Sequence, residues 1–314
     1  MTRSSSRHAA LDARMRAVGP SETSSRIDLH THTLRSDGLL QPGELLRAAA
    51  DAGVRLLALT DHDTLAGYRE LAAAGAAILS GLDLVPGVEI NAMTGADRRL
   101  ADSELHILGL GVDPSDEAFE SILAAQRAGR RIRFERMIER LAGLGLDVRE
   151  ALAGAQASGR PHPHADGDDA LGRPTIGRAL IAIGAAATVE ESFDRYLSRG
   201  RPGYVAREGI GPREAIRAIT AAGGLAVLAH FGNAAERHDV VAELVEAGLG
   251  GIEVHHLSFE PATAEAVGEV ARLFGLVPTA GTDYHGDLGP YADAHARFAV
   301  PPTVEDQVRA ALGR

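Results

Sequence analysis

The chain has 314 residues, 45% of them hydrophobic and 24% charged, so it is long enough for one large α/β domain or for a domain that carries an insertion. It contains no cysteine, which excludes disulfides, zinc fingers and thiol redox chemistry and leaves histidine and carboxylate side chains as the ligands for any metal. The formal net charge of −11 indicates a surface that repels long polyanions, so a nucleotide substrate would require a local concentration of cations.

Residues 1–25 precede the first predicted element. They are rich in Ser and Arg and lack the apolar segment of a secretory signal. We expect a disordered leader here, with a transit peptide as the alternative. No apolar run in the chain is long enough to span a bilayer, so no membrane partner is expected.

The next elements alternate between strand and helix. Strands are predicted over 25–30, 54–60, 82–90 and 105–112, and helices over 42–52 and 64–77. The second strand is apolar throughout, as is typical of a strand buried on both faces of a parallel sheet. The third is expected to be interrupted by Pro86 and Gly87.

From residue 114 to residue 203 the pattern is mainly helical. Helices are predicted over 116–143, 175–187 and 189–197, with a polar loop over 158–172. Alternation then returns, with helices over 212–222, 238–247, 261–274 and 304–312 and strands over 225–230, 251–255 and 276–281.

Repeated β-α units with apolar strands predict an α/β fold with a parallel sheet, and about seven such strands indicate a closed or nearly closed barrel. We expect residues 26–113 and 204–314 to form this barrel. Residues 114–203 would then be a helical domain inserted in one βα loop, where they would serve as a substrate-binding lid.

Histidine and carboxylate side chains recur at or near the ends of the predicted strands. They are His30, His32, Asp37, His62, Glu89, His106, His230, Asp283 and His285. A single histidine in such a place is more often a hydrogen-bonded structural residue, but so many at the strand ends of an α/β barrel favour a metal site. His30 and His32 lie two apart on a strand, so their side chains point the same way and can bind one ion.

A second segment copies this spacing without a strand before it. His162, His164 and Asp169 lie in PHPHADGDD, among Pro, Gly and Asp. We expect an exposed loop here, with adventitious metal binding as the alternative.

Carboxylates also stand beside the predicted ligands. Asp61 and Asp63 flank His62, and either could orient an imidazole or cap the following helix, with Asp63 favouring the cap. Asp28, close to His30, raises the same question.

Six segments, in this order, resemble the motifs of the PHP (polymerase and histidinol phosphatase) family. They are DLHTHTLRSDG, ALTDHDTLAG, PGVEI, ELHILGLG, LAH and GTDYHG, and they extend from Ile27 to Gly286. Within the family the chain is similar to the nucleotide phosphoesterase branch, which carries a helical insertion after the ELHILGLG-type strand. The segment QRAGRRIRFERMIERL is also similar to that branch.

The resemblance implies a distorted (β/α)7 barrel that holds two or three divalent ions. By motif position, the first ion would take His30, His32, Glu89 and Asp283, the second Asp37, His62 and His285, and the third Glu89, His106 and His230. Two segments depart from the family pattern: Ala229-His230-Phe231-Gly232 stands for the usual AHP-G, and GTDYHG stands for the usual GSDFHG. Neither removes a ligand, but we expect Phe231 to reshape the lip of the pocket.

Mixed imidazole and carboxylate ligands suit Mn²⁺, Fe²⁺ or Zn²⁺ better than Ca²⁺ or Mg²⁺ alone. Such ions lower the pKa of a bound water and neutralise phosphate oxygens. Because no serine nucleophile stands in a recognisable setting, we expect in-line attack by metal-bound hydroxide. The water would be held by His30, His32, Glu89, Asp283 and His285.

Arginines recur every third residue in the longest predicted helix, at positions 127, 130, 133 and 136, and form a drifting stripe. The stripe is either a solvated face paired with Glu135 and Glu139 or a surface that holds an anion. The resembled branch uses arginines from this region to hold a second phosphate. The candidate substrate-binding residues are therefore Arg130, Arg133, Arg173 and His256.

The predicted function is hydrolysis of nucleotide phosphate esters, with the 3′-phosphate of nucleoside 3′,5′-bisphosphates and short oligoribonucleotides as substrates, in the cytoplasm and without a stable protein partner. One alternative is a phosphatase for a small monoester such as histidinol phosphate, against which the long insertion argues. Others are a non-catalytic PHP module, in which degenerate ligands would be expected, and an amidohydrolase that acts on C–N bonds.

Overall fold

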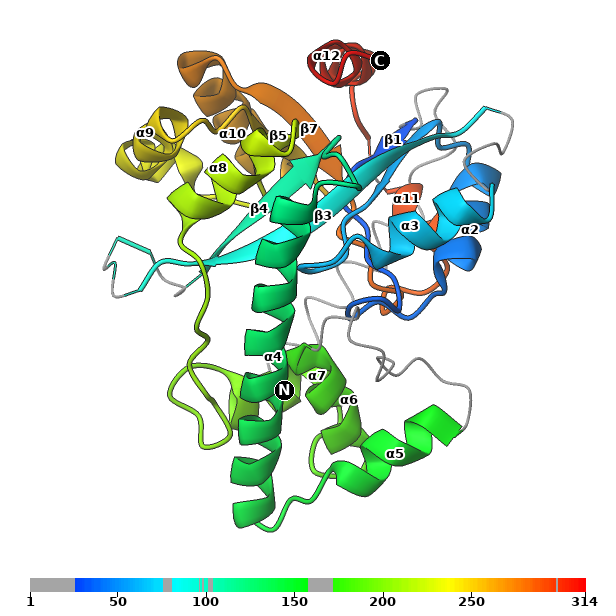
Figure 1. The fold of residues 1–314 in the computed structure, drawn as a ribbon, viewed down its shortest axis with the longest axis vertical. Coiled ribbons are helices and arrows are strands. Elements are labelled where there is room, and N and C mark those ends of the chain that lie inside the picture. Colours follow the sequence, from blue (N-terminus) through cyan, green and yellow to red (C-terminus); the bar gives the residue numbers. More distant parts are fainter. Residues whose placement is uncertain are drawn as a thin grey trace.

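The computed structural model describes residues 26–75, 81–95, 97, 99–100, 104–157, 172–297 and 299–314. Seven strands form one sheet in which neighbours follow chain order (Figure 1). They are β1 (Ile27–Asp28), β2 (Leu56–Leu59), β3 (Asp83–Met93), β4 (Glu104–Leu110), β5 (Leu225–Leu228), β6 (Gly251–His256) and β7 (Val277–Gly281). The predicted leader and the PHPHADGDD segment lie outside the described residues.

The sheet curls into a nearly closed barrel because β1 lies beside β7. The Leu29 amide donates to the Ala280 carbonyl over 2.9 Å, and the His32 amide donates to the Tyr284 carbonyl over 3.0 Å. The predicted fold class, a nearly closed α/β barrel with an added helical part, is confirmed.

One strand differs from the predicted parallel arrangement. β4 runs antiparallel to both β3 and β5, whereas the other neighbouring pairs are parallel. The reversal brings the first half of β4 to the edge at which the parallel strands end. His106, two residues after the start of β4, therefore faces Asn91 near the end of β3.

The predicted interruption of β3 is wrong. Pro86 pairs with Leu59 of β2, and Gly87 pairs with Leu110 of β4. A Cβ atom at Gly87 would lie 2.7 Å from the Leu59 carbonyl oxygen, so glycine here allows the close approach of β2 and β3 rather than a break.

Apolar side chains fill the barrel, and a helix closes one end. Leu56, Val85, Leu108 and Val227 are fully buried in one cluster, against which α12 (Pro302–Ala311) packs Val304 and Val308. Figure 1 shows α12 across the end of the barrel that lies away from α5 and α6. The opposite end is left for polar side chains.

Helices cover the outside of the barrel on two sides. On one side are α2 (Pro42–Asp51), α3 (Ala66–Ala73) and α11 (Tyr291–His295), the last of which the sequence did not predict. On the other side are α8 (Pro212–Ala221), η3 (Ala234–Glu236), α9 (His238–Glu246) and α10 (Pro261–Phe274). α8 illustrates the amphipathic pattern, because Ala215, Ile216 and Ile219 lie on its buried face.

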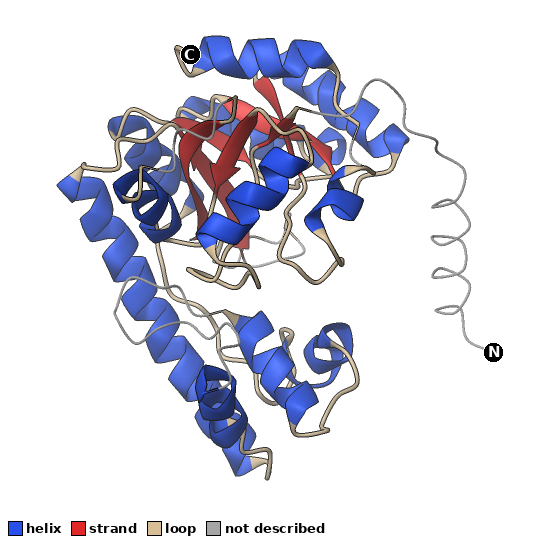
Figure 2. Ribbon diagram, turned by 90° about the vertical axis from the view of Figure 1, so that its right-hand side faces the viewer, coloured by secondary structure: helices blue, strands red, loops and turns tan. Residues whose placement is uncertain are grey.

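A helical lobe hangs from the barrel (Figure 2) and comprises α4 (Glu117–Gly143), α5 (Arg149–Ala157), α6 (Arg173–Ala182), α7 (Val189–Ser192) and one π-helical segment (Phe193–Leu197). α4 packs Phe119 and Leu123 into the barrel-side core, and its second half packs Phe134 and Leu141 into the lobe's own cluster. α4 thus joins two apolar cores. None of the described helices is long and apolar enough to cross a membrane.

Candidate metal centre

The nine residues predicted as ligands gather at the open end of the barrel. Glu89, in the middle of β3, is the hub: its two carboxylate oxygens lie between 2.7 and 3.4 Å from nitrogens of His30, His32, His62, His106 and His230. Asp283, after β7, lies 3.3 Å from His30 Nε2 and 3.2 Å from His32 Nε2. The sequence therefore predicted a set that the fold does bring together.

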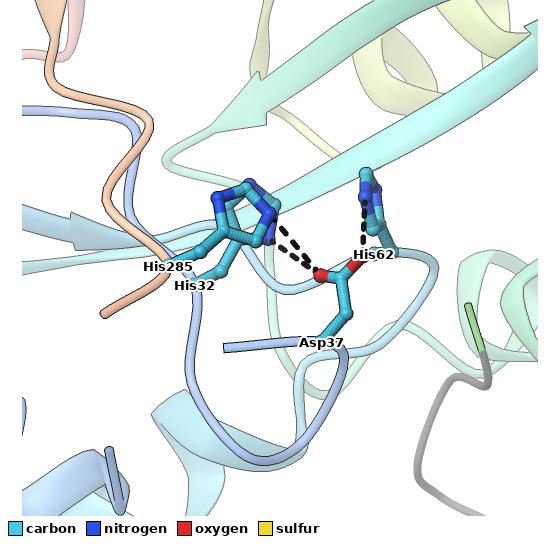
Figure 3. Close-up of side chains that lie close together, drawn as sticks. All are labelled: His32, Asp37, His62 and His285. Carbon is cyan, nitrogen blue, oxygen red and sulfur yellow. Dashed lines mark ion pairs between the residues drawn. The ribbon is translucent and has the colours of Figure 1, made fainter. Parts of the chain in front are cut away.

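Asp37 holds the second group, which Figure 3 shows with His32, His62 and His285 around the carboxylate. Its Oδ1 lies 3.3 Å from His285 Nε2, and its Oδ2 lies 3.6 Å from His62 Nε2. One potential ligand atom of each of these four residues lies within 4.8 Å of the others. His32 thus stands between the first and the second predicted ion positions.

The buried polar atoms at this centre test whether metal ions fit. His30 Nε2, His32 Nε2, His62 Nδ1, Asp37 Oδ1 and Glu89 Oε2 are buried and have no hydrogen-bond partner among the described residues. Leaving such atoms unsatisfied costs about 1–3 kcal/mol each. Because these atoms converge and combine imidazole nitrogen with carboxylate oxygen, they fit a borderline divalent ion.

The electrostatics also favour a cation. Burial alone would raise the pKa of Glu89, yet the surrounding histidines hold it well below its usual range. Burial lowers the pKa of His62 to about 4, so its imidazole is neutral and has a free lone pair. Burial also acts to lower the pKa of His32, but contacts with Asp283 and Glu89 raise it to about 10, which indicates a strong local demand for positive charge.

The backbone is strained at two of the predicted ligands. φ is +33° at His230 and +53° at Asp283, both just after strands. Left-handed backbone at residues other than glycine costs about 1–3 kcal/mol and persists where the surroundings impose it. Here the His230 amide donates to Glu253 Oε2 over 2.8 Å, and the Asp283 amide donates to the His30 carbonyl over 2.8 Å.

Glu253, in β6, is a residue that the sequence reasoning missed. It is fully buried, and its Oε1 lies 3.2 Å from Nδ1 of His30. A carboxylate there accepts the Nδ1 proton and leaves the lone pair of Nε2 facing the centre. The available signal was a single acidic residue inside the apolar strand GIEVHH.

The carboxylates beside the ligands have structural partners. Asp61 accepts from the Thr33 amide, the Thr33 hydroxyl and the Ser36 hydroxyl, each over 2.7 Å, and so fixes the loop that carries His32 and Asp37. Asp28 accepts from the Thr282 amide and hydroxyl, which ties β1 to the segment after β7. Among the hydrogen bonds of the described residues, neither side chain contacts an imidazole of the nine predicted ligands.

The predicted helix cap at Asp63 is wrong. Asp63 has φ +53°, and its Oδ2 accepts from Arg130 Nε and from Arg207 Nη2, each over 2.5 Å. α3 begins only at Ala66, after Leu65. The sequence could not anticipate these partners, because they come from α4 and from the segment before α8.

The arginine stripe divides between two environments. Arg127 and Arg130 are buried against the barrel, Arg133 is partly buried, and Arg131 and Arg136 are exposed. The interpretation of the stripe as a solvated face is therefore wrong for Arg127 and Arg130. It agrees with the exposure of Arg131 and Arg136.

A cavity of about 190 Å³ lies between the centre and the helical lobe. Of the predicted substrate-binding residues, Arg130, Arg133 and Arg173 line it. His256 does not line it but lies close by, with its Nε2 3.7 Å from Asp283 Oδ2. Phe231 is buried in the barrel-side core, so the prediction that it shapes the lip of the pocket is wrong.

Comparison with known proteins agrees with this geometry. A model of the PHP domain matches residues 28–145. The 3′,5′-nucleoside bisphosphate phosphatase of Chromobacterium violaceum is 34% identical over 83% of this chain and 87% of its own length, and the 5′-3′ exoribonuclease Rnm of Salmonella typhimurium is 32% identical over 88% and 91%. A solved structure from Bifidobacterium adolescentis, classed as a metal-dependent phosphoesterase, superposes with a TM-score of 0.74 at 29% identity and covers 94% of this chain and all of its own. The chain belongs to the PHP family of phosphoric ester hydrolases.

Proposed function

We propose that this protein removes the 3′-phosphate from nucleoside 3′,5′-bisphosphates, with two or three divalent ions bound by the nine clustered residues, and that it also shortens small oligoribonucleotides. The names of the relatives support both activities. Because the proposed substrates are nucleotides and RNA ends made inside the cell, we place the activity in the cytoplasm.

One observation carries the choice of substrate: a single cavity joins the predicted metal centre to a group of cations. Arg130, Arg133, Arg173 and Arg207 line it; Asp63 pairs with Arg130 and Arg207, and Glu104 pairs with Arg173 and lies near Arg207. Burial and the nearby charges of Arg173 and Arg207 lower the pKa of Arg133 to about 10. Crowded cations of this kind would be stabilised by a second anionic group on the substrate.

The side chains that line the cavity on the lobe side favour a nucleoside, which would lie between the two phosphates. Phe134, Met137, Ile176 and Phe193 provide an apolar wall, and the Arg173 guanidinium lies 5.2 Å from the centre of the Phe193 ring. We propose that residues 114–203 act as the substrate-binding lid. A small monoester such as histidinol phosphate would use neither the wall nor the second group of cations.

The side chains have distinct proposed roles. Divalent ions, when bound, would lower the pKa of a water and neutralise phosphate oxygens. His30, His32, Glu89, Asp283 and His285 would hold the ions and their water, while Arg133 and Arg173 would orient the distal phosphate. Asp283 also faces His256, which lies outside the cavity lining and would therefore act on the substrate through Asp283.

Phosphate release from a panel of substrates tests the proposal. With Mn²⁺, the protein should hydrolyse 3′-phosphoadenosine 5′-phosphate much faster than AMP or histidinol phosphate. Similar rates on all three would overturn the bisphosphate assignment, and no release from any of them would overturn the phosphoesterase itself. His30→Ala and Asp283→Ala should abolish release while the circular dichroism spectrum is retained.

A matched set of variants tests the distal phosphate site. Arg133→Glu and Arg173→Glu should raise KM for the bisphosphate by 10-fold or more, since a buried charge-assisted pair contributes about 1.5–3 kcal/mol. Arg131→Glu is the control, because Arg131 lies on the same helix as Arg133 but is exposed. An unchanged KM in Arg133→Glu and Arg173→Glu would remove these arginines from the site.

A further inference from the structure

We propose that Arg130 is a positioning residue that acts through Asn91 to hold the proton of His106 on Nδ1, and that it thereby weakens the third predicted ion site, formed by Glu89, His106 and His230. The inference rests on the proposed metal cluster. It follows from which atoms of the chain donate hydrogen bonds and which accept them.

The first step is the orientation of the Asn91 amide. Arg130 is buried on α4, where its Nε donates to Asp63 Oδ2 over 2.5 Å and its Nη2 donates to Asn91 Oδ1. A guanidinium can only donate, so the Asn91 atom that faces it must be the carbonyl oxygen. The amide nitrogen of Asn91 then points the other way.

The second step is the tautomer of His106. Asn91 Nδ2 lies 2.5 Å from His106 Nε2. Because an amide nitrogen donates, Nε2 must accept, and the neutral imidazole carries its proton on Nδ1. Nδ1 lies 2.7 Å from Glu89 Oε1 and 3.0 Å from His230 Nε2, so the proton points to the place where these three residues would share an ion.

His30 shows the opposite arrangement. Its outward nitrogen, Nδ1, faces the Glu253 carboxylate, and its inward nitrogen, Nε2, faces Glu89 and Asp283. An acceptor on the outward nitrogen prepares a histidine to bind an ion, and a donor there does the reverse. The first ion position is therefore prepared for binding, whereas the third is opposed.

An ion at the third position requires a change in this chain of contacts. The proton must leave Nδ1 of His106 while Nε2 takes one up, and the Asn91 amide must turn over to accept it. Turning over would place Asn91 Nδ2 against the Arg130 guanidinium, donor against donor. The contact between α4 and β3 thus sets the affinity of the third ion.

Two variants change this relay, by which we mean the contacts that lead from Arg130 through Asn91 to His106, and a third variant serves as the control. Asn91→Asp supplies oxygens to both Arg130 and His106, and Arg130→Met removes the donor that holds the amide. Both should tighten the third Mn²⁺ by about 10-fold or more, the usual effect of a residue that orients a metal ligand. Arg127→Met is the control, because Arg127 docks the same helix on the Asp63 carbonyl, while the Glu120 carboxylate that it also contacts lies within α4.

Two measurements on the full chain decide the matter. Nitrogen-15 chemical shifts of the metal-free protein report the tautomer of His106, and calorimetric titration with Mn²⁺ reports each affinity. We expect the proton on Nδ1, two tightly bound ions and one weaker ion, which Asn91→Asp and Arg130→Met tighten and Arg127→Met does not.

Other results would overturn the inference in distinguishable ways. A proton on Nε2, three ions of equal affinity, or a third ion that Asn91→Asp leaves unchanged or weakens would refute the relay and leave the metal cluster standing. Absence of any Mn²⁺ binding would refute both. If Arg130→Met does not fold, Asn91→Asp still decides, because it retains the Arg130 contact.

Discussion

Gly281, the last residue of β7, packs against His30, a ligand of the first predicted ion, and against Glu253, which orients that histidine. A Cβ atom there would lie 2.2 Å from His30 Cβ and 2.4 Å from Glu253 Oε1. The Cβ atom of His30 moves only with its backbone, so the chain cannot relieve such an overlap by turning a side chain. A single hydrogen atom at this position therefore allows Glu253 to reach His30.

At the residue scale we predict that Gly281→Ala weakens the tightest Mn²⁺ by roughly 10–100-fold, because it displaces His30 from Glu253. It should also destabilise the metal-free protein by about 1–3 kcal/mol through overpacking. Calorimetry and urea unfolding measure the two effects. Gly143→Ala is the control, since a Cβ atom there meets nothing within 4 Å. Unchanged Mn²⁺ binding in Gly281→Ala would show that this close packing does not position His30.

At the scale of elements, one carboxylate links the barrel to the helical lobe. Glu104 begins β4, and its Oε1 accepts from Nη2 of Arg173, the first residue of α6, over 2.9 Å. Burial by itself raises the pKa of Glu104, but the charges of His106, Arg173 and Arg207 lower it to about 2. The link is thus an ionised contact across the cavity.

The depressed pKa of Glu104 has a consequence for stability. A carboxyl with a lowered pKa in the folded state contributes stability that is fully present above its ordinary pKa, near 4.5, and is lost as the pH falls toward 2. The difference in unfolding free energy between the metal-free wild type and Glu104→Gln should therefore shrink over that window. Urea unfolding at a series of pH values measures it, with exposed Glu139→Gln as the control. A difference that is constant with pH would contradict the assignment.

At the scale of the whole molecule, the predicted ligands come from segments that extend from His30 to His285. Ions that bind all of these residues would link the segment after β1 to the segment after β7. An unfolded chain could not bind the ions in that way. Binding to the folded state alone stabilises it by mass action.

We therefore expect Mn²⁺ at about 100 times its dissociation constant to raise the unfolding free energy by about 2.7 kcal/mol for each independent site. A chelator should reverse the effect, and thermal unfolding measures both. Ca²⁺ should stabilise much less, because it prefers oxygen to imidazole ligands. Equal stabilisation by Ca²⁺ would argue against histidine ligation.

The sequence by itself determined the order of the seven strands and of most helices, though not α5 and α11, as well as the barrel class, the family and the set of clustered histidines and carboxylates. These depend on local quantities: the period of apolar residues, the residues that end strands, and the order of motifs along the chain. They survive errors of a few residues in the bounds of an element, as the shorter β1 and the divided helix at 189–197 illustrate.

Only the tertiary structure decided the direction of β4, the role of Asp63 and the surroundings of the arginine stripe. Each depends on a partner far away in the chain: β4 on β5, and Asp63 on Arg130 and Arg207. Glu253 and Asn91 belong here too, since one acidic or amide residue in a strand says nothing about which nitrogen of which histidine it will face. Residue types along a chain specify which chemistry is available, whereas the protonation and orientation of each ligand are set by contacts that exist only once the chain has folded.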